Sequence, residues 1–196
     1  MGEKEIELIE VKAIKNYNNC DEFAAYIARE FFRKSGVNRY RLIKTDEMSD
    51  EQVVKACQLY CEENDLLHEY SVFLGQEEAL HTGKQYLGKV IDVAVDRPLG
   101  THHPQHKELV YPVNYGYFDE VYAADGEPQD VYILGIYEPI SAFRGSVIAV
   151  IRRFDDDETK WVVAPDEYDF SKKEIEKATH FQEKYFKTEI LMQGDF

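Results

Sequence analysis

Residues 111–130 combine aromatic hydroxyls with a cluster of carboxylates. The stretch reads YPVNYGYFDEVYAADGEPQD and ends with Asp125, Glu127 and Asp130 within six residues. A glycine and a proline between the acids predict a tight turn that aims the carboxylates at one point. Carboxylates this close raise each other's pKa unless a cation lies among them, and magnesium prefers such oxygen ligands. The turn predicts a magnesium site, with a solvated acidic loop as the alternative.

A second acidic run, residues 155–158 (DDDE), is followed by Lys160. Alone, this run is typical of a solvated hairpin tip. Together with the turn it predicts more than one metal ion held between two loops. Two metals beside a water lower its pKa and position it to attack phosphorus, and a lysine neutralises phosphate oxygens. The candidate phosphate donors are Arg97, Lys160, Lys187, Tyr115 and Tyr185.

Composition narrows the classes of protein and partner. The 196 residues carry a net charge of −15, with 44% apolar and 31% charged residues. This balance is typical of a soluble globular protein and disfavours binding to nucleic acid or anionic membrane. The charges at residues 3–5 precede any apolar run, so we expect no signal peptide. An odd cysteine count predicts a reducing, cytoplasmic compartment.

The first part of the chain predicts a small α/β module, residues 1–84. Cys57 and Cys61 lie four residues apart on one predicted helix and are interpreted as buried core thiols. Ser49 and Gln52 form a capping-box pattern at the start of that helix. We expect strands at residues 5–14, 37–44 and 70–74, helices at 21–34 and 49–61, and a short helix or linker at 76–86.

The second part, residues 85–196, is rich in predicted strands. Glycines and prolines separate them at a spacing that predicts a small barrel. Ser171, with a glutamate three residues on, predicts the cap of a final helix that runs toward Ile190. The expected strands are residues 90–95, 131–136, 147–153 and 160–163, with a loop at 167–170.

Four motifs in this order resemble the soluble (family I) inorganic pyrophosphatases over residues 88–190. They are VDR at 95–97, YPVNYGY at 111–117, the DGEPQD turn with the later acidic run and its lysine, and HFQEKY at 180–185. The resemblance implies an α+β protein with a five-stranded, OB-like β-barrel and flanking helices, preceded here by the α/β module. It also implies an oligomer.

The resemblance implies a role for each matching residue. Asp125 and Asp130 would bind metal, as would Asp156 (or Asp155) and Glu158. Glu127 would stand for the aspartate that helps to activate the attacking water, so Glu127, Asp125 and Lys160 form the expected catalytic set. The residues implied in phosphate binding are Arg97, Tyr115, Lys160 and Tyr185.

The chain departs from the family pattern at several positions. Glu127 and Glu158 replace aspartates, Gln129 replaces an apolar residue, and Phe186 replaces a lysine, with Lys187 one position late. The early hairpin of the family, with its glutamate and lysine, has no counterpart. The longer loop at 98–110 carries His103 and His106, which are candidates to supply the missing phosphate contacts or a further metal ligand. A histidine-rich surface loop is the alternative.

Three functions follow from these observations. The first is hydrolysis of inorganic diphosphate to two phosphates, dependent on Mg²⁺ or Mn²⁺. The second keeps the fold and metals but acts on a nucleotide or other organic diphosphate. The third is a catalytically weakened module that binds metal or phosphate. We expect a small-molecule substrate, no nucleic acid or membrane partner, and a homo-oligomer in the cytoplasm.

Overall fold

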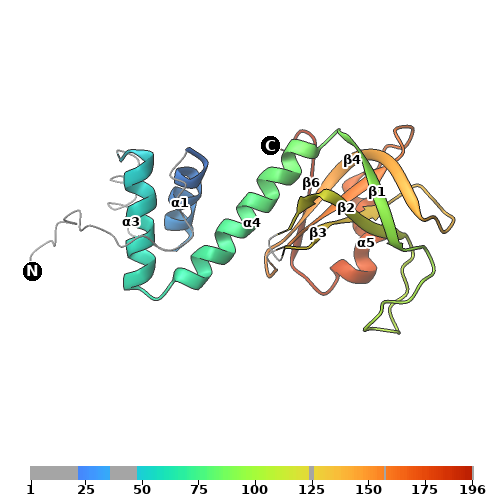
Figure 1. Cartoon of the computed structure of the whole chain (residues 1–196), viewed down its shortest axis with the longest axis horizontal. Helices are drawn as coiled ribbons and strands as arrows, with labels where there is room; N and C mark the ends of the chain where they lie inside the picture. The colour runs from blue at the N-terminus through green and yellow to red at the C-terminus, as the bar shows by residue number, and fades with distance from the viewer. Residues whose placement is uncertain (1–21, 36–47, 124–125, 157, 196) are drawn as a thin grey trace, which may run out of the picture. The chain divides into compact units, whose positions relative to one another are not determined.

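A computed structural model of the chain describes residues 22–35, 48–123, 126–156 and 158–195 (Figure 1). It divides into two compact units, Met1–Leu74 and Gly75–Phe196. Helix α4, Leu67–Tyr86, begins in the first unit and ends in the second. The domain boundary expected from the sequence, between residues 84 and 85, stays a prediction.

The described part of the first unit is helical. Helix α1 covers Glu22–Lys34 and α3 covers Asp50–Glu63, as the sequence predicted. The capping box is present, because the Ser49 side chain accepts from the Gln52 backbone N–H and the Gln52 side chain accepts from the Ser49 N–H. The strands predicted at residues 5–14 and 37–44 lie outside the described residues.

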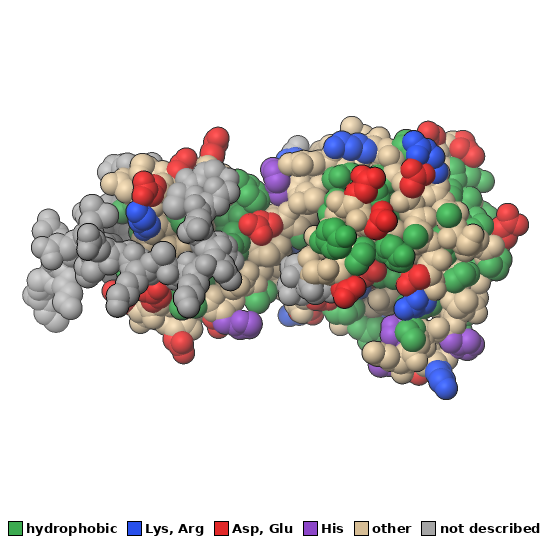
Figure 2. Space-filling view, in the orientation of Figure 1, with side chains coloured by type: hydrophobic (Ala, Val, Ile, Leu, Met, Phe, Trp, Pro, Cys, Tyr) green, Lys and Arg blue, Asp and Glu red, His purple; other side chains and the backbone are tan. Residues whose placement is uncertain are grey.

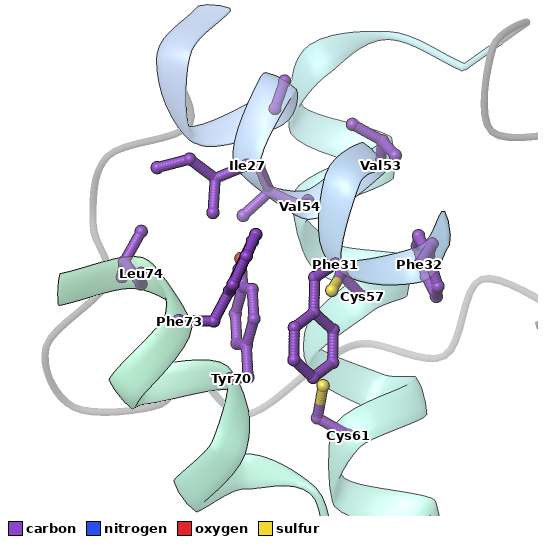
Figure 3. Packing of buried hydrophobic residues seen from close by; sticks show 12 residues of the cluster. Ile27, Phe31, Phe32, Val53, Val54, Cys57, Cys61, Tyr70, Phe73 and Leu74 are labelled. Atoms are coloured by element: carbon purple, nitrogen blue, oxygen red, sulfur yellow. The ribbon is translucent and has the colours of Figure 1, made fainter. Parts of the chain in front are cut away.

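Aromatic and aliphatic residues form the core of this unit. The ring of Phe31 lies 4.9 Å from that of Tyr70 and 5.6 Å from that of Phe73, measured between centroids (Figure 3). Cys57 and Cys61 are buried free thiols in the same cluster, which confirms their interpretation as core residues.

The strand predicted at residues 70–74 is wrong, because this segment belongs to α4. Tyr70, Phe73 and Leu74 are all buried, and their three- and four-residue spacing places them on one helical face. A short apolar run fits a strand and a helix equally well. Residues 76–86, expected to form a short helix or a linker, continue the same helix.

The second unit contains a closed five-stranded β-barrel, as predicted. Around the barrel the strand order is β1, β2, β3, β5, β4 and again β1, with β3 and β5 parallel and the other pairs antiparallel. The strands are β1 (Val90–Arg97), β2 (Asn114–Tyr122), β3 (Pro128–Ile133), β4 (Ala142–Arg153) and β5 (Thr159–Ala164). Strand β2 was not predicted, and β3 begins three residues earlier than expected, so that Asp130 lies within it.

Two apolar layers stabilise the barrel. The inner cluster contains residues of all five strands, among them Val93, Phe118 and Trp161. The outer cluster includes Tyr132 and Val162 and lies under helix α5, Lys172–Glu183, which begins at the predicted capping box. Every residue of β5 is buried, since one face points to each layer.

The final helix is shorter than predicted. It ends at Glu183, and residues Thr188–Met192 form strand β6, which pairs with the edge of β4. Ile190 and Leu191 lie opposite Ile151 and Val150 in this pairing.

Strands β1 and β2 approach closely at Gly116. A Cβ atom at this position would lie 1.9 Å from the carbonyl oxygen of Ala94, far inside van der Waals contact. Glycine is therefore required between Tyr115 and Tyr117 for the two strands to pair. Within the described residues, none of the helices has the length and apolar character needed to cross a membrane.

Candidate active site

A lysine clamped between two carboxylates lies at the centre of the candidate site. The Lys160 ammonium donates to Asp130 and to Glu158. The parallel pairing of β3 and β5 sets Val131 opposite Trp161, which brings Asp130 beside Lys160. Lys160 is only 3% exposed, so its charge requires such partners. The structure thus joins three predicted site residues from two separate segments.

A buried arginine extends this network to α5. The Arg153 guanidinium donates from Nε and Nη2 to Glu183, at 2.9 and 2.6 Å. Its Nη1 lies 2.9 Å from Asp156 Oδ2 and 3.9 Å from Glu158 Oε2. Burial alone would lower the pKa of Arg153, but the hydrogen bonds and charge of Glu183 raise it well above the usual value. Asp156, a predicted metal ligand, is thereby bound to a protein cation.

Three tyrosines line the neighbouring region. Burial and the charge of Asp130 raise the pKa of Tyr115, which hydrogen-bonds Asp130. Burial and Glu183 raise the pKa of Tyr132, whose hydroxyl donates to Glu183 at 2.5 Å. Both hydroxyls therefore stay protonated at neutral pH and act as neutral donors. Burial raises the pKa of Tyr111 also, and a hydrogen bond with Arg97 opposes that shift.

Arg97 ends β1 and lies close to the same carboxylates. Its Nη1 donates to Asp96 Oδ2 at 2.6 Å. Burial raises the pKa of Asp96. The charge of Arg97 opposes this shift, and the charge of Asp130 adds to it. The charges of Arg97 and Asp130 therefore act on the same groups, Asp96 and Tyr111.

The histidine loop between β1 and β2 borders a separate cavity. His103, His106 and Tyr185 line this cavity of about 460 Å³, with Leu109 and Phe186 on its apolar side. The His103 ring lies 5.0 Å from that of His106 and stacks on Tyr111 at 6.2 Å. Figure 2 shows several histidine side chains gathered at this edge of the barrel. Burial, His106 and Arg97 lower the pKa of His103.

Two of the predicted site residues, Glu127 and Lys187, lie apart from this network at the surface. Glu127 is exposed in the turn, which Gly126 makes with a φ of 83°. Lys187 is exposed, and its backbone N–H donates to Asp155 Oδ1 at 2.9 Å. Asp125 lies outside the described residues, so its role stays a prediction.

Two buried side-chain amides, those of Gln129 and Asn114, hold backbone segments in place around the site. Gln129 Nε2 donates to the carbonyls of Thr159 and Asp130, at 2.7 and 3.0 Å. Asn114, fully buried, accepts from the backbone of Leu99 and Ile140. The asparagine of YPVNYGY thus joins two loops at the end of the barrel.

The sequence reasoning missed Arg153 and Glu183. One signal was available: Ile175, Thr179 and Glu183 recur at four-residue spacing and are the buried residues of α5. A carboxylate on a buried helical stripe requires a cationic partner. Arg153 offered no comparable signal, since a charged residue at a strand end is usually solvated.

The carboxylate oxygens at Asp130 and Glu158 fit a hard divalent cation. Within the described residues, no three acidic, histidine or cysteine side chains gather closely enough to enclose a metal ion. Asp125, the further expected ligand, is not among those residues.

Comparison with known proteins agrees with the motifs. The inorganic pyrophosphatase family model matches residues 88–190. Among solved structures, inorganic pyrophosphatase from Ehrlichia chaffeensis is 20% identical, with 54% of this chain and 87% of that chain covered and a TM-score of 0.43. The Neisseria gonorrhoeae enzyme is 21% identical, with 48% and 72% covered and a TM-score of 0.41.

A third structure, the Thermus thermophilus enzyme, is 18% identical, with 53% and 80% covered and a TM-score of 0.38. The curated proteins gave no match. The residues matched by the family model are those that carry the resemblance in the sequence, and they make up more than half of the chain. The chain therefore belongs to the inorganic pyrophosphatase family, a family of hydrolases.

Proposed function

We propose that the protein hydrolyses inorganic diphosphate to two phosphates in the presence of Mg²⁺, with Mn²⁺ as a substitute. The observation that supports this most directly is the contact of Lys160 with Asp130 and Glu158. It sets a cation for phosphate oxygens beside carboxylates for a divalent ion, within the segment that the family model matches.

Each side chain then has a defined task. Asp130 and Glu158 would hold magnesium together with Asp125, the ligand expected from the motif. The bound ion would neutralise phosphate oxygens and lower the pKa of a coordinated water. Asp156 accepts a hydrogen bond from Arg153.

The remaining groups bind phosphate and move protons. Lys160 and Arg97 offset the charge of the phosphate oxygens, and Tyr115 donates as a neutral hydroxyl because its pKa is raised. Glu127, on the exposed turn, would accept the proton of the attacking water. The residues proposed to bind the departing phosphate are His103, His106, Tyr185 and Lys187.

The test is phosphate release from inorganic diphosphate with Mg²⁺, with Mn²⁺ and with chelator. Asp130→Asn should lower turnover by about 10²-fold or more, whereas the control Asp92→Asn, an exposed carboxylate on β1, should not. Full activity in Asp130→Asn would refute this site, and no metal-dependent release by the unmodified protein would favour the catalytically weakened module.

The cavity of about 460 Å³ beside the histidine loop supports a second candidate substrate class. Its volume lies in the range of small-molecule sites, about 300–1,000 Å³, and would accept the organic group of a nucleotide diphosphate. Turnover of a nucleotide panel against inorganic diphosphate separates the two, and a clear preference for inorganic diphosphate removes the organic substrates.

We further propose a homo-oligomer in the cytoplasm. Light scattering after size-exclusion chromatography measures the oligomeric state, and a molar mass equal to one chain would refute the homo-oligomer.

A further inference from the structure

All three nitrogens of the Arg153 guanidinium have protein partners. Glu183 takes Nε and Nη2, Asp156 takes Nη1, and Glu158 lies at 3.9 Å. The guanidinium carbon lies 3.8 Å from the centre of the Phe186 ring, which covers one face. Arg153 is 3% exposed.

Arg153 cannot leave this position without exposing a buried charge. Glu183 is 6% exposed, and its carboxylate also accepts a hydrogen bond from the hydroxyl of Tyr132. Removing one partner of a buried ion pair is strongly destabilising, because the other charge stays without compensation. Lys160 differs, since its compact ammonium on a flexible stem can turn toward another anion.

The acidic loop is held in the arrangement that meets Arg153. The Gln76 side chain donates to the carbonyl of Asp156 at 2.8 Å. The carboxylate of Asp155 accepts from the backbone of Lys187 at 2.9 Å. Asp155 and Asp156 were the two candidates for one metal-binding position. Both carboxylates thus accept hydrogen bonds from other groups of the protein.

We propose that Arg153 takes the place of a divalent cation between Asp156 and Glu158. A metal ion bridging these two carboxylates would have to approach a fixed positive charge. Divalent cations therefore bind on the Asp130 side of the network. Asp156 pairs with Arg153 and does not act as a metal ligand. This inference rests on the proposed metal-dependent function, but it concerns metal number and is tested without substrate.

The experiment counts Mn²⁺ ions bound to the full chain by electron paramagnetic resonance. Asp156→Asn should leave the number and affinity of bound Mn²⁺ unchanged within twofold, whereas Asp130→Asn should weaken binding tenfold or more. The double variant Arg153→Met with Glu183→Gln removes the guanidinium and its buried partner charge together. It should bind one Mn²⁺ ion more than the unmodified protein.

The matched control is Arg144→Met with Asp92→Asn, which removes an exposed ion pair between β4 and β1 and should gain no ion. A tenfold loss of affinity in Asp156→Asn would overturn the proposal, as would an unchanged ion count in the folded double variant. If circular dichroism shows that the double variant does not fold, the Asp156→Asn result decides. A gained ion in the double variant, together with no metal-dependent phosphate release by the unmodified protein, would defeat the proposed function and leave this inference standing.

Discussion

Gln129 offers a quantitative test of how the site is held, because it is a buried amide where the family pattern has an apolar residue. We expect Gln129→Met to keep the volume of the side chain and lose its hydrogen bonds. The amide donates to the carbonyls of Thr159 and Asp130, at 2.7 and 3.0 Å, and Gln129 is 2% exposed.

The magnitude follows from these contacts. Two hydrogen bonds contribute about 1 kcal/mol each, and leaving the Thr159 carbonyl buried without its partner costs on the order of 1 kcal/mol more. The similar volume of methionine avoids a cavity cost. The free energy of unfolding should therefore fall by about 2–3 kcal/mol.

The assay is urea unfolding followed by the fluorescence of Trp161, the single tryptophan of the chain, which is fully buried in the barrel. With a slope of about 2 kcal/mol per molar urea, the midpoint should fall by about 1–1.5 M. Gln85→Met, at an exposed glutamine that contacts His81, is the control and should leave the midpoint unchanged. A Gln129→Met midpoint within about 0.3 M of the unmodified protein would refute the reasoning.

Three further outcomes are expected. Lys160→Met should lower turnover by about 10²-fold and raise Mn²⁺ affinity, because Asp130 and Glu158 lose a competing ammonium; weaker Mn²⁺ binding would contradict this. Tyr115→Phe should lower turnover by about 10²-fold, with no change expected in the exposed control Tyr137→Phe. Burial, His106 and Arg97 lower the pKa of His103, and this pKa should rise when inorganic phosphate binds. Phosphate affinity should therefore increase as the pH falls through the pKa of His103. NMR titration of the imidazole measures the pKa, and a pKa that phosphate does not change would exclude contact.

The barrel was largely predictable because its strands carry local signals. Residues 90–95 alternate between buried and exposed positions, and glycines and prolines separate the strands. The capping boxes at Ser49 and Ser171 are equally local and were predicted correctly. Strand β2 was not predicted, and the predictions for Tyr70–Leu74 and the end of α5 failed. The last two are short apolar runs whose structure depends on the surface that they pack against.

The candidate site was predictable where the chemistry resides in motifs. Asp130, Glu158 and Lys160 were identified from residue type and spacing, and the structure joins them. The ion pair of Arg153 with Glu183 was not predictable. The two residues come from a strand and a helix, 30 positions apart, and none of the four motifs contains both. Long-range pairing of buried charges leaves no periodic pattern in a sequence.

The close approach of β1 and β2 at Gly116 has a consequence for mutational libraries of this protein. Because a Cβ atom would meet a backbone oxygen rather than a movable side chain, no residue larger than glycine should survive selection there. No atom of the described residues lies within 4 Å of the Cβ position at Gly126, and its φ is 83°, a conformation that asparagine and aspartate also adopt. A saturation library should therefore retain one codon family at the first position and several at the second.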